Sequence, residues 1–124
     1  MNRGDLIRRM ILRAIADDYE NVDQVIYRQC AAAGAAIDLT IERSDIVDAL
    51  RGLIQEGLAK AYLFSSTNDC MEFHGMPPLD VIETDFKTYF YITKKGLEHH
   101  STDTRWPFDD QDNLRPDWVL DGTP

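Results

Sequence analysis

Apolar residues in the first half of the chain recur at three- and four-residue steps, in three separate blocks. This spacing aligns apolar side chains along one face of an α-helix, so each block predicts an amphipathic helix with one buried side. The predicted buried faces are Ile7, Met10, Ile11, Ala14 and Ile15; then Val22, Val25, Ile26, Cys30 and Ala33; then Ile46, Val47, Leu50, Leu53 and Ile54.

Polar residues and glycines mark the expected ends of these helices. The first helix is expected from Asp5 to Asp18. An asparagine followed three residues later by glutamine is a capping-box pattern, which starts the second helix at Asn21. Glycine ends helices readily because it adopts positive φ without a steric penalty. The second helix should therefore stop at Gly34, and the third should run from a cap at Thr40 or Ser44 to a stop at Gly57.

The second half of the chain has a different character. Residues 58–64 and 86–92 are rich in aromatic and β-branched side chains, which predicts two strands that pair antiparallel. The connection between them, residues 65–85, is too long for a tight turn and contains glycine and proline, so we expect a loop with some local order of its own. Thr93 can cap a short helical segment over residues 94–100. These elements predict an α+β, mainly α, fold.

Two phrases carry a resemblance to a known family. Residues 46–58 read IVDALRGLIQEGL, which resembles the recognition helix of winged-helix transcriptional regulators and the turn that follows it. Residues 91–97 read YITKKGL, which resembles the Tyr-x-Leu-Thr-x-x-Gly signature of that family. The resemblance covers residues 4–100 and implies a winged helix-turn-helix, a three-helix core with a long antiparallel β-hairpin wing. The expected winged-helix domain is residues 1–100.

The resemblance also implies a function, the binding of duplex DNA by a homodimer whose two third helices address neighbouring half-sites. In that role, residues of the third helix would reach bases or phosphates, and lysines beside the wing strands would contact phosphates. The same residues also fit a solvated helix face and charged sheet edges that prevent aggregation. The candidate DNA contacts are Arg43, Ser44, Arg51, Lys60, Lys87, Lys94 and Lys95.

The net charge of -9 opposes DNA binding, because phosphate contacts require lysine and arginine. The charge is segregated: residues 1–14 carry four arginines against one aspartate, and residues 101–124 carry six aspartates against two arginines. The third helix and its flanks, residues 42–56, carry four acids against two arginines. This balance favours an alternative function, a winged-helix protein–protein interaction module that does not bind DNA and uses the aromatic strands, the wing and the tail tryptophans.

Residues 101–124 form an acidic tail that nevertheless contains large apolar side chains. A fully solvated tail would not carry such groups, so we expect it to dock on the domain or on a partner. One hypothesis is that its aspartates cover the basic face of the first helix and keep nucleic acid away; the other is that its tryptophans complete the core or a dimer interface. The candidate docking residues are Arg8, Arg9, Arg13, Trp106, Phe108 and Trp118.

Several function classes are not expected. Cys30 and Cys70 lack a CxxC spacing and are interpreted as free thiols. Cys70 and His74, with the adjacent histidines at 99 and 100, lack the paired spacings of zinc motifs, so no metal is expected. No nucleophile is placed beside a base and no phosphate-binding glycine motif occurs, which predicts neither an enzyme nor a cofactor.

The chain begins directly with an amphipathic segment, and its longest run of small apolar residues, 31–37, is too short to cross a bilayer. We therefore expect a cytoplasmic protein that does not associate with a membrane.

Overall fold

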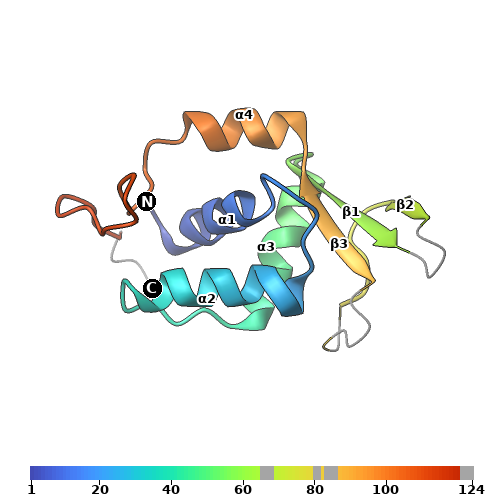
Figure 1. Ribbon diagram of the computed structural model, residues 1–124, viewed down its shortest axis with the longest axis horizontal. Coiled ribbons are helices and arrows are strands. Elements are labelled where there is room, and N and C mark those ends of the chain that lie inside the picture. Colours follow the sequence, from blue (N-terminus) through green and yellow to red (C-terminus); the bar gives the residue numbers. More distant parts are fainter. Residues whose placement is uncertain (65–68, 80–81, 83–86, 121–124) are drawn as a thin grey trace.

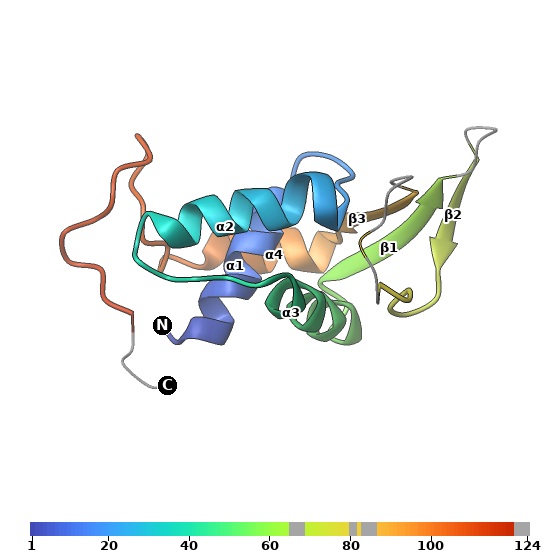
Figure 2. The same ribbon diagram turned by 90° about the horizontal axis from the view of Figure 1, so that it is seen from below.

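The computed structural model describes residues 1–64, 69–79, 82 and 87–120. Helix α1 lies at the centre and packs against α2, α3 and α4, while the sheet extends from one end of the helices and the tail passes their other end (Figures 1 and 2). In chain order the elements are α1 Arg3–Ala14, a π-helical turn Val22–Ile26, α2 Tyr27–Ala35, α3 Arg43–Gln55, β1 Ala59–Phe64, β2 Cys70–Phe73, β3 Thr88–Ile92 and α4 Lys94–Thr102.

The central helix α1 begins and ends earlier than the sequence predicts. Asn2 caps it by accepting a hydrogen bond from the Asp5 backbone N–H at 2.8 Å. The helix ends at Ala14, ahead of Asp17 and Asp18, because acidic side chains oppose the negative end of a helix dipole. Of the predicted buried face, Ile7, Met10, Ile11 and Ile15 are buried and Ala14 is half-buried, while Leu6 and Leu12 are buried in addition.

The second helical segment starts where the sequence predicts but ends later. The side chain of Asn21 accepts from the Gln24 N–H at 2.7 Å, which confirms the predicted cap. The predicted stop at Gly34 is wrong, because α2 continues through it to Ala35. A Cβ atom at Gly34 would lie 2.6 Å from the Leu39 carbonyl oxygen, so this glycine permits close packing of the following loop.

Helix α3 is capped by Glu42, so the predicted caps Thr40 and Ser44 are wrong. The Glu42 and Asp45 side chains form a capping box, in which the Glu42 N–H donates to Asp45 at 2.8 Å. A glutamate can serve here because its carboxylate accepts from the orphan N–H groups of the first turn. The predicted stop is confirmed: α3 ends at Gln55, and Gly57 follows with φ of +74°.

The sheet has the order β2-β1-β3, and β1 and β3 pair antiparallel as predicted. Strand β2 lies within the segment expected to be a loop and pairs antiparallel with β1. It was missed because its sequence, Cys-Met-Glu-Phe, is mostly exposed and lacks an apolar alternation. The predicted first residue of the last strand, Phe86, lies outside the described residues.

The last helix is longer than expected. Its cap is the predicted Thr93, whose hydroxyl accepts from the Gly96 N–H at 3.0 Å. It continues to Thr102, where the hydroxyls of Ser101 and Thr102 donate to carbonyls one turn earlier. None of the helices in the described ranges has both the length and the apolarity that a membrane span needs. The four helices and three-stranded antiparallel sheet make an α+β arrangement compatible with a winged-helix layout.

Candidate interaction surfaces

The exposed side of α3 carries few cations available to a polyanion. Ser44 and Arg51 are both exposed, but Arg51 pairs with Asp48 one turn earlier at 3.1 Å. Arg43 is largely covered: its Nε donates to Asp23 at 2.6 Å and its Nη1 donates to the Leu79 carbonyl at 2.8 Å. Both arginines of the expected recognition helix are therefore held by carboxylates of the chain itself.

The four candidate lysines differ in their surroundings. Lys60 of β1 pairs with Glu72 of β2 at 2.9 Å, and this hydrogen bond raises the pKa of Lys60 and lowers that of Glu72. The Lys95 ammonium donates to the Glu56 backbone carbonyl at 2.9 Å, at the end of α3. Lys87 and Lys94 are exposed. The candidate lysines thus lie on the sheet and at the start of α4, not on α3.

The side of the sheet that faces away from the core is lined by aromatic rings, here called the aromatic face. Tyr19, from the connection after α1, has its ring centroid 4.6 to 5.5 Å from three strand rings, those of Tyr62, Phe64 and Tyr91. Phe64 in turn packs edge-to-face on Tyr89 at 4.8 Å. Opposite side chains on the same strands, such as the fully buried Phe90, face the helices. The aromatic face is therefore built on two paired strands, on the side opposite Phe90, and of its rings Tyr91 also packs partly against the core.

Tyr19 is the member of this face that sequence reasoning missed. The strand aromatics share one side because strand side chains alternate, which the sequence shows directly. Tyr19 joins them because Glu20 and Phe90 exchange two backbone hydrogen bonds of 3.0 and 2.8 Å. This bridge joins positions 70 residues apart in sequence, and no local sequence pattern at Tyr19 predicts it.

The tail meets the arginines of α1, as one hypothesis from the sequence requires. The guanidinium groups of Arg9 and Arg13 lie 5.0 and 5.1 Å from the Trp106 ring centroid. Arg13 also pairs with Asp112 at 3.0 Å. The carboxylate of Asp109 instead accepts from backbone N–H groups of its own loop. The contact of the tail with these two arginines therefore rests on one indole and one carboxylate.

The other three predicted docking residues have separate surroundings. Phe108 packs on Trp106 with ring centroids 5.7 Å apart. The indole N–H of Trp118 donates to the Arg105 carbonyl at 2.8 Å, so Trp118 folds the tail back on itself. Arg8 points away from the tail and pairs with Glu56 of α3.

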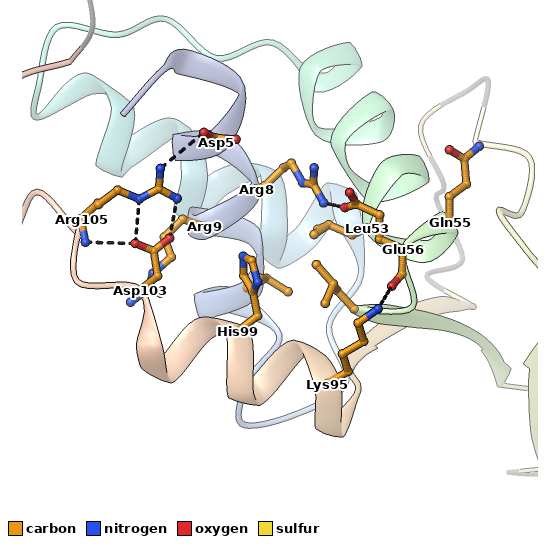
Figure 3. Close-up of a pocket in the computed structure, with 12 residues that line it drawn as sticks. Asp5, Arg8, Arg9, Leu53, Gln55, Glu56, Lys95, His99, Asp103 and Arg105 are labelled. Atoms are coloured by element: carbon orange, nitrogen blue, oxygen red, sulfur yellow. Dashed lines mark hydrogen bonds and ion pairs between the residues drawn. The ribbon is translucent and has the colours of Figure 1, made fainter.

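A cleft of about 480 Å³ opens between α1, the end of α3 and α4 (Figure 3). Leu12, Leu53 and Leu58 give it an apolar floor. Its rim is charged: Arg105 binds Asp103 at 3.0 Å and Asp5 at 3.5 Å, as Figure 3 shows. The complete lining is Asp5, Arg8, Arg9, Leu12, Leu53, Gln55, Glu56, Leu58, Lys95, His99, Asp103 and Arg105.

The two cysteines are free thiols, as predicted, and they occupy opposite environments. Cys30 is buried in the core and Cys70 is exposed on β2. Within the described ranges, no three side chains of His, Cys, Asp or Glu converge in a way that would hold a metal ion.

We expect the two thiols to differ sharply in reactivity. A thiol reagent such as Ellman's should modify Cys70 in the folded protein and reach Cys30 only after unfolding, because burial raises the pKa of Cys30 to about 12. The unfolded chain ionises this thiol at lower pH, so stability should fall as the pH rises from about 9 toward 12. Cys30→Ala should flatten that decline in urea titrations. Rapid modification of both thiols in the native state would contradict the burial.

Comparisons with family models, with curated proteins and with solved structures find no significant match to this chain.

Proposed function

We propose that this chain is a winged-helix protein-interaction module that binds another protein through its aromatic face. The observation that carries the proposal is the cluster of Tyr19 with the rings of Tyr62, Phe64, Tyr89 and Tyr91 on the side of the sheet away from the core. Tyr19, at its centre, remains 37% exposed. Tyrosine is enriched in protein interfaces because its ring supplies apolar area and its hydroxyl a polar contact.

The packing of these rings favours binding. Each ring is held edge-to-face by a neighbour, so little side-chain freedom remains to be lost when a partner covers the surface. The backbone beneath them is a paired sheet, and such faces change little between free and bound states. A preformed surface of this kind suits recognition of a folded partner.

The winged-helix assignment rests on the order and placement of the elements. Helices α1 to α3 precede an antiparallel sheet, and the β1–β2 hairpin projects from the end of the helices where a wing would lie (Figures 1 and 2). Helix α3 occupies the place of a recognition helix in this layout. The fold alone does not decide between a protein and a DNA partner.

The charges favour a protein. Arg43, Arg51 and Lys60 each have a carboxylate partner within 3.1 Å, so a phosphate would have to displace an existing ion pair. The net charge of -9 adds repulsion at longer range. A protein partner that presents apolar side chains to the aromatic face meets neither obstacle.

A second candidate function is duplex DNA binding through α3. It is favoured by the exposure of Ser44 and Arg51 on that helix and of Lys94 at the start of α4. Arg51 and Asp48 lie three positions apart on the helix surface. Such an ion pair stabilises a helix by only about 0.2–0.5 kcal/mol, so a phosphate could replace the Asp48 carboxylate.

Site-specific photocrosslinking tests the protein proposal. Benzoylphenylalanine introduced at Tyr19 should yield a defined protein adduct in cells that express the chain natively, whereas the same group at Ser44 on α3 should not. Once the partner is identified and purified, Tyr19→Ala should weaken its binding about thirtyfold, the loss of about 2 kcal/mol expected for an aromatic hot spot. An adduct with a second copy of this chain would show that the aromatic face forms a homodimer. Crosslinking from Ser44 without crosslinking from Tyr19 would refute the assignment of the surface.

Fluorescence anisotropy with mixed-sequence duplex DNA separates the two candidates. We expect no salt-sensitive binding by the full chain between low and physiological salt, because the α3 cations are already paired. Salt-sensitive binding that Arg51→Gln weakens would instead establish the second candidate.

A further inference from the structure

The two edges of the sheet differ in how their backbone groups are used. On the outer edge of β3, Phe90 exchanges two hydrogen bonds with Glu20, and the Ile92 N–H donates to the Ile15 carbonyl at 3.2 Å. The segment after α1 therefore covers that edge. Strand β2 forms the other edge, at the end of the sheet farthest from the helices (Figures 1 and 2). Within the described ranges, no further segment pairs with it.

The backbone groups of Cys70 and Glu72 point away from β1. In an antiparallel sheet, a residue directs its N–H and its carbonyl to the same neighbouring strand, and successive residues alternate between the two sides. The Phe64 N–H donates at 2.9 Å on the β3 side, so the backbone groups of Leu63 face β2. Leu63 lies opposite Met71, which therefore bonds to β1 and leaves its two neighbours in β2 turned outward. Neither of these outward residues has a backbone partner in the part of the chain that the structure describes.

The outer edge of β2 is poorly protected against another strand. Proline, bulges and unpaired charges discourage such addition, and Cys70–Phe73 contains no proline or bulge. Its one charge, on Glu72, is paired with Lys60 at 2.9 Å. The Met71 side chain is 64% exposed. The length of four residues limits pairing to a strand of similar length, which would satisfy the free backbone groups and cover this methionine.

We propose that the β2 edges of two copies of this chain pair antiparallel about a two-fold axis at Met71. In this register Cys70 of one copy lies opposite Glu72 of the other, and each such pair exchanges both of its backbone hydrogen bonds. A two-fold axis at Glu72 would instead place two carboxylates directly opposite each other, which is destabilising. An axis at Cys70 would leave the outward groups of Glu72 without a partner in β2.

The side chains at this interface are compatible with each other. The two Met71 side chains meet as a non-hydrogen-bonded pair, the closer kind of cross-strand pair, and cover one another. Each Glu72 keeps Lys60 of its own copy as a partner. The same patch serves both copies, as a two-fold dimer requires. Because the pairing uses an edge, it leaves both aromatic faces uncovered, and the inference does not depend on the proposed protein partner.

Disulfide trapping tests both the pairing and its register. Met71→Cys in a Cys70→Ser background places the two new residues about 4.5 Å apart at Cα, a separation that a disulfide spans. Mild oxidation should therefore convert most of the chain to a covalent dimer on a non-reducing gel. In the wild type, the two Cys70 residues are diagonal neighbours about 7–8 Å apart and should not crosslink. Ser44→Cys, exposed on α3, controls for random collisions in the same background.

Two results of this trapping would count against the proposal. Dimers that form no faster from Met71→Cys than from Ser44→Cys would overturn the pairing of β2 edges. Faster crosslinking through the wild-type Cys70 than through Met71→Cys would overturn the register.

Sedimentation equilibrium of the full chain measures the dimer without a crosslink. Glu72→Pro removes one outward N–H from each copy but no hydrogen bond to β1. It should weaken association about thirtyfold, because each copy loses one backbone hydrogen bond of the usual net strength. Glu72→Gln keeps the N–H and removes the charge, so association should be almost unchanged.

Equal losses by the two variants would show that the backbone of Glu72 does not pair, and would refute the proposal. A wild-type chain that stays monomeric at its highest soluble concentration would also overturn it, and would leave the edge to a strand of another protein. Circular dichroism verifies that both variants fold. If Glu72→Pro does not fold, the trapping result decides.

Discussion

Gly96→Ala should lower the free energy of unfolding by about 3 kcal/mol or more, a severe case of overpacking. A Cβ atom at this position would lie 2.0 Å from the Leu58 carbonyl oxygen and 2.8 Å from Cγ1 of Ile92. The first of these is a backbone atom between α3 and β1, so it cannot rotate away as a flexible side chain would. Relief requires the start of α4 to move away from the sheet, and urea unfolding measures the resulting loss.

Gly52→Ala is the matched control for this effect. Gly52 lies inside α3, and a Cβ atom there would have no neighbour within 4 Å. Alanine should therefore raise stability by about 0.5–1 kcal/mol through its better helix propensity. Similar destabilisation by the two substitutions would contradict the assignment of the Gly96 effect to the close approach of α4 to Leu58.

Phe90→Ala should lower the free energy of unfolding by about 4 kcal/mol, because it empties the centre of the core. Phe90 is fully buried and lies on the side of β3 that faces the helices. Its backbone also forms the two hydrogen bonds with Glu20 that carry Tyr19 to the sheet. The loss should appear in urea unfolding monitored by circular dichroism.

Tyr91→Ala, one residue further along the strand, separates core packing from the aromatic face. Tyr91 is half-buried and packs on Tyr19 at 4.6 Å on the opposite side of the sheet. Losing this ring contact should lower stability by about 1 kcal/mol. If the two variants lost equal stability, the aromatic face would belong to the core and would be no candidate for a partner.

Much of the fold was predictable from local sequence patterns. Helical periodicity located all three N-terminal helices, and the aromatic strands β1 and β3 pair antiparallel as expected. Asn21, Gly57 and Thr93 act at helix ends as their side chains or their φ preferences indicate. These features depend on residues within one or two helical turns of each other, so the residues that form each interaction are close together in the sequence.

Features that depend on distant residues were missed or misassigned. Strand β2 exists because it pairs with β1, although its own residues are mostly exposed. Gly34 was expected to end a helix, but Leu39 and Ile41 pack where its side chain would be. In both cases the deciding contact lies in another segment.

The same division applies to the candidate sites. The arginines of α1 and Trp106 are conspicuous in the sequence, but only the structure stacks Arg9 and Arg13 on that indole. Arg43 resembles a DNA contact in sequence, yet Asp23, which is 8% exposed and 20 residues away, holds its guanidinium. The cleft at Lys95 had no sequence signal, because its lining comes from three helices and the segments that follow two of them.

The sequence by itself therefore determined the helices, the two principal strands and the side of each that is buried, since hydrophobic periodicity acts within each element. The tertiary structure alone decided which charges are neutralised and which are left over, because electrostatic partners meet in space regardless of their separation along the chain. The proposal of a protein partner in preference to the DNA partner that the resemblance implies rests on this distribution of paired charge.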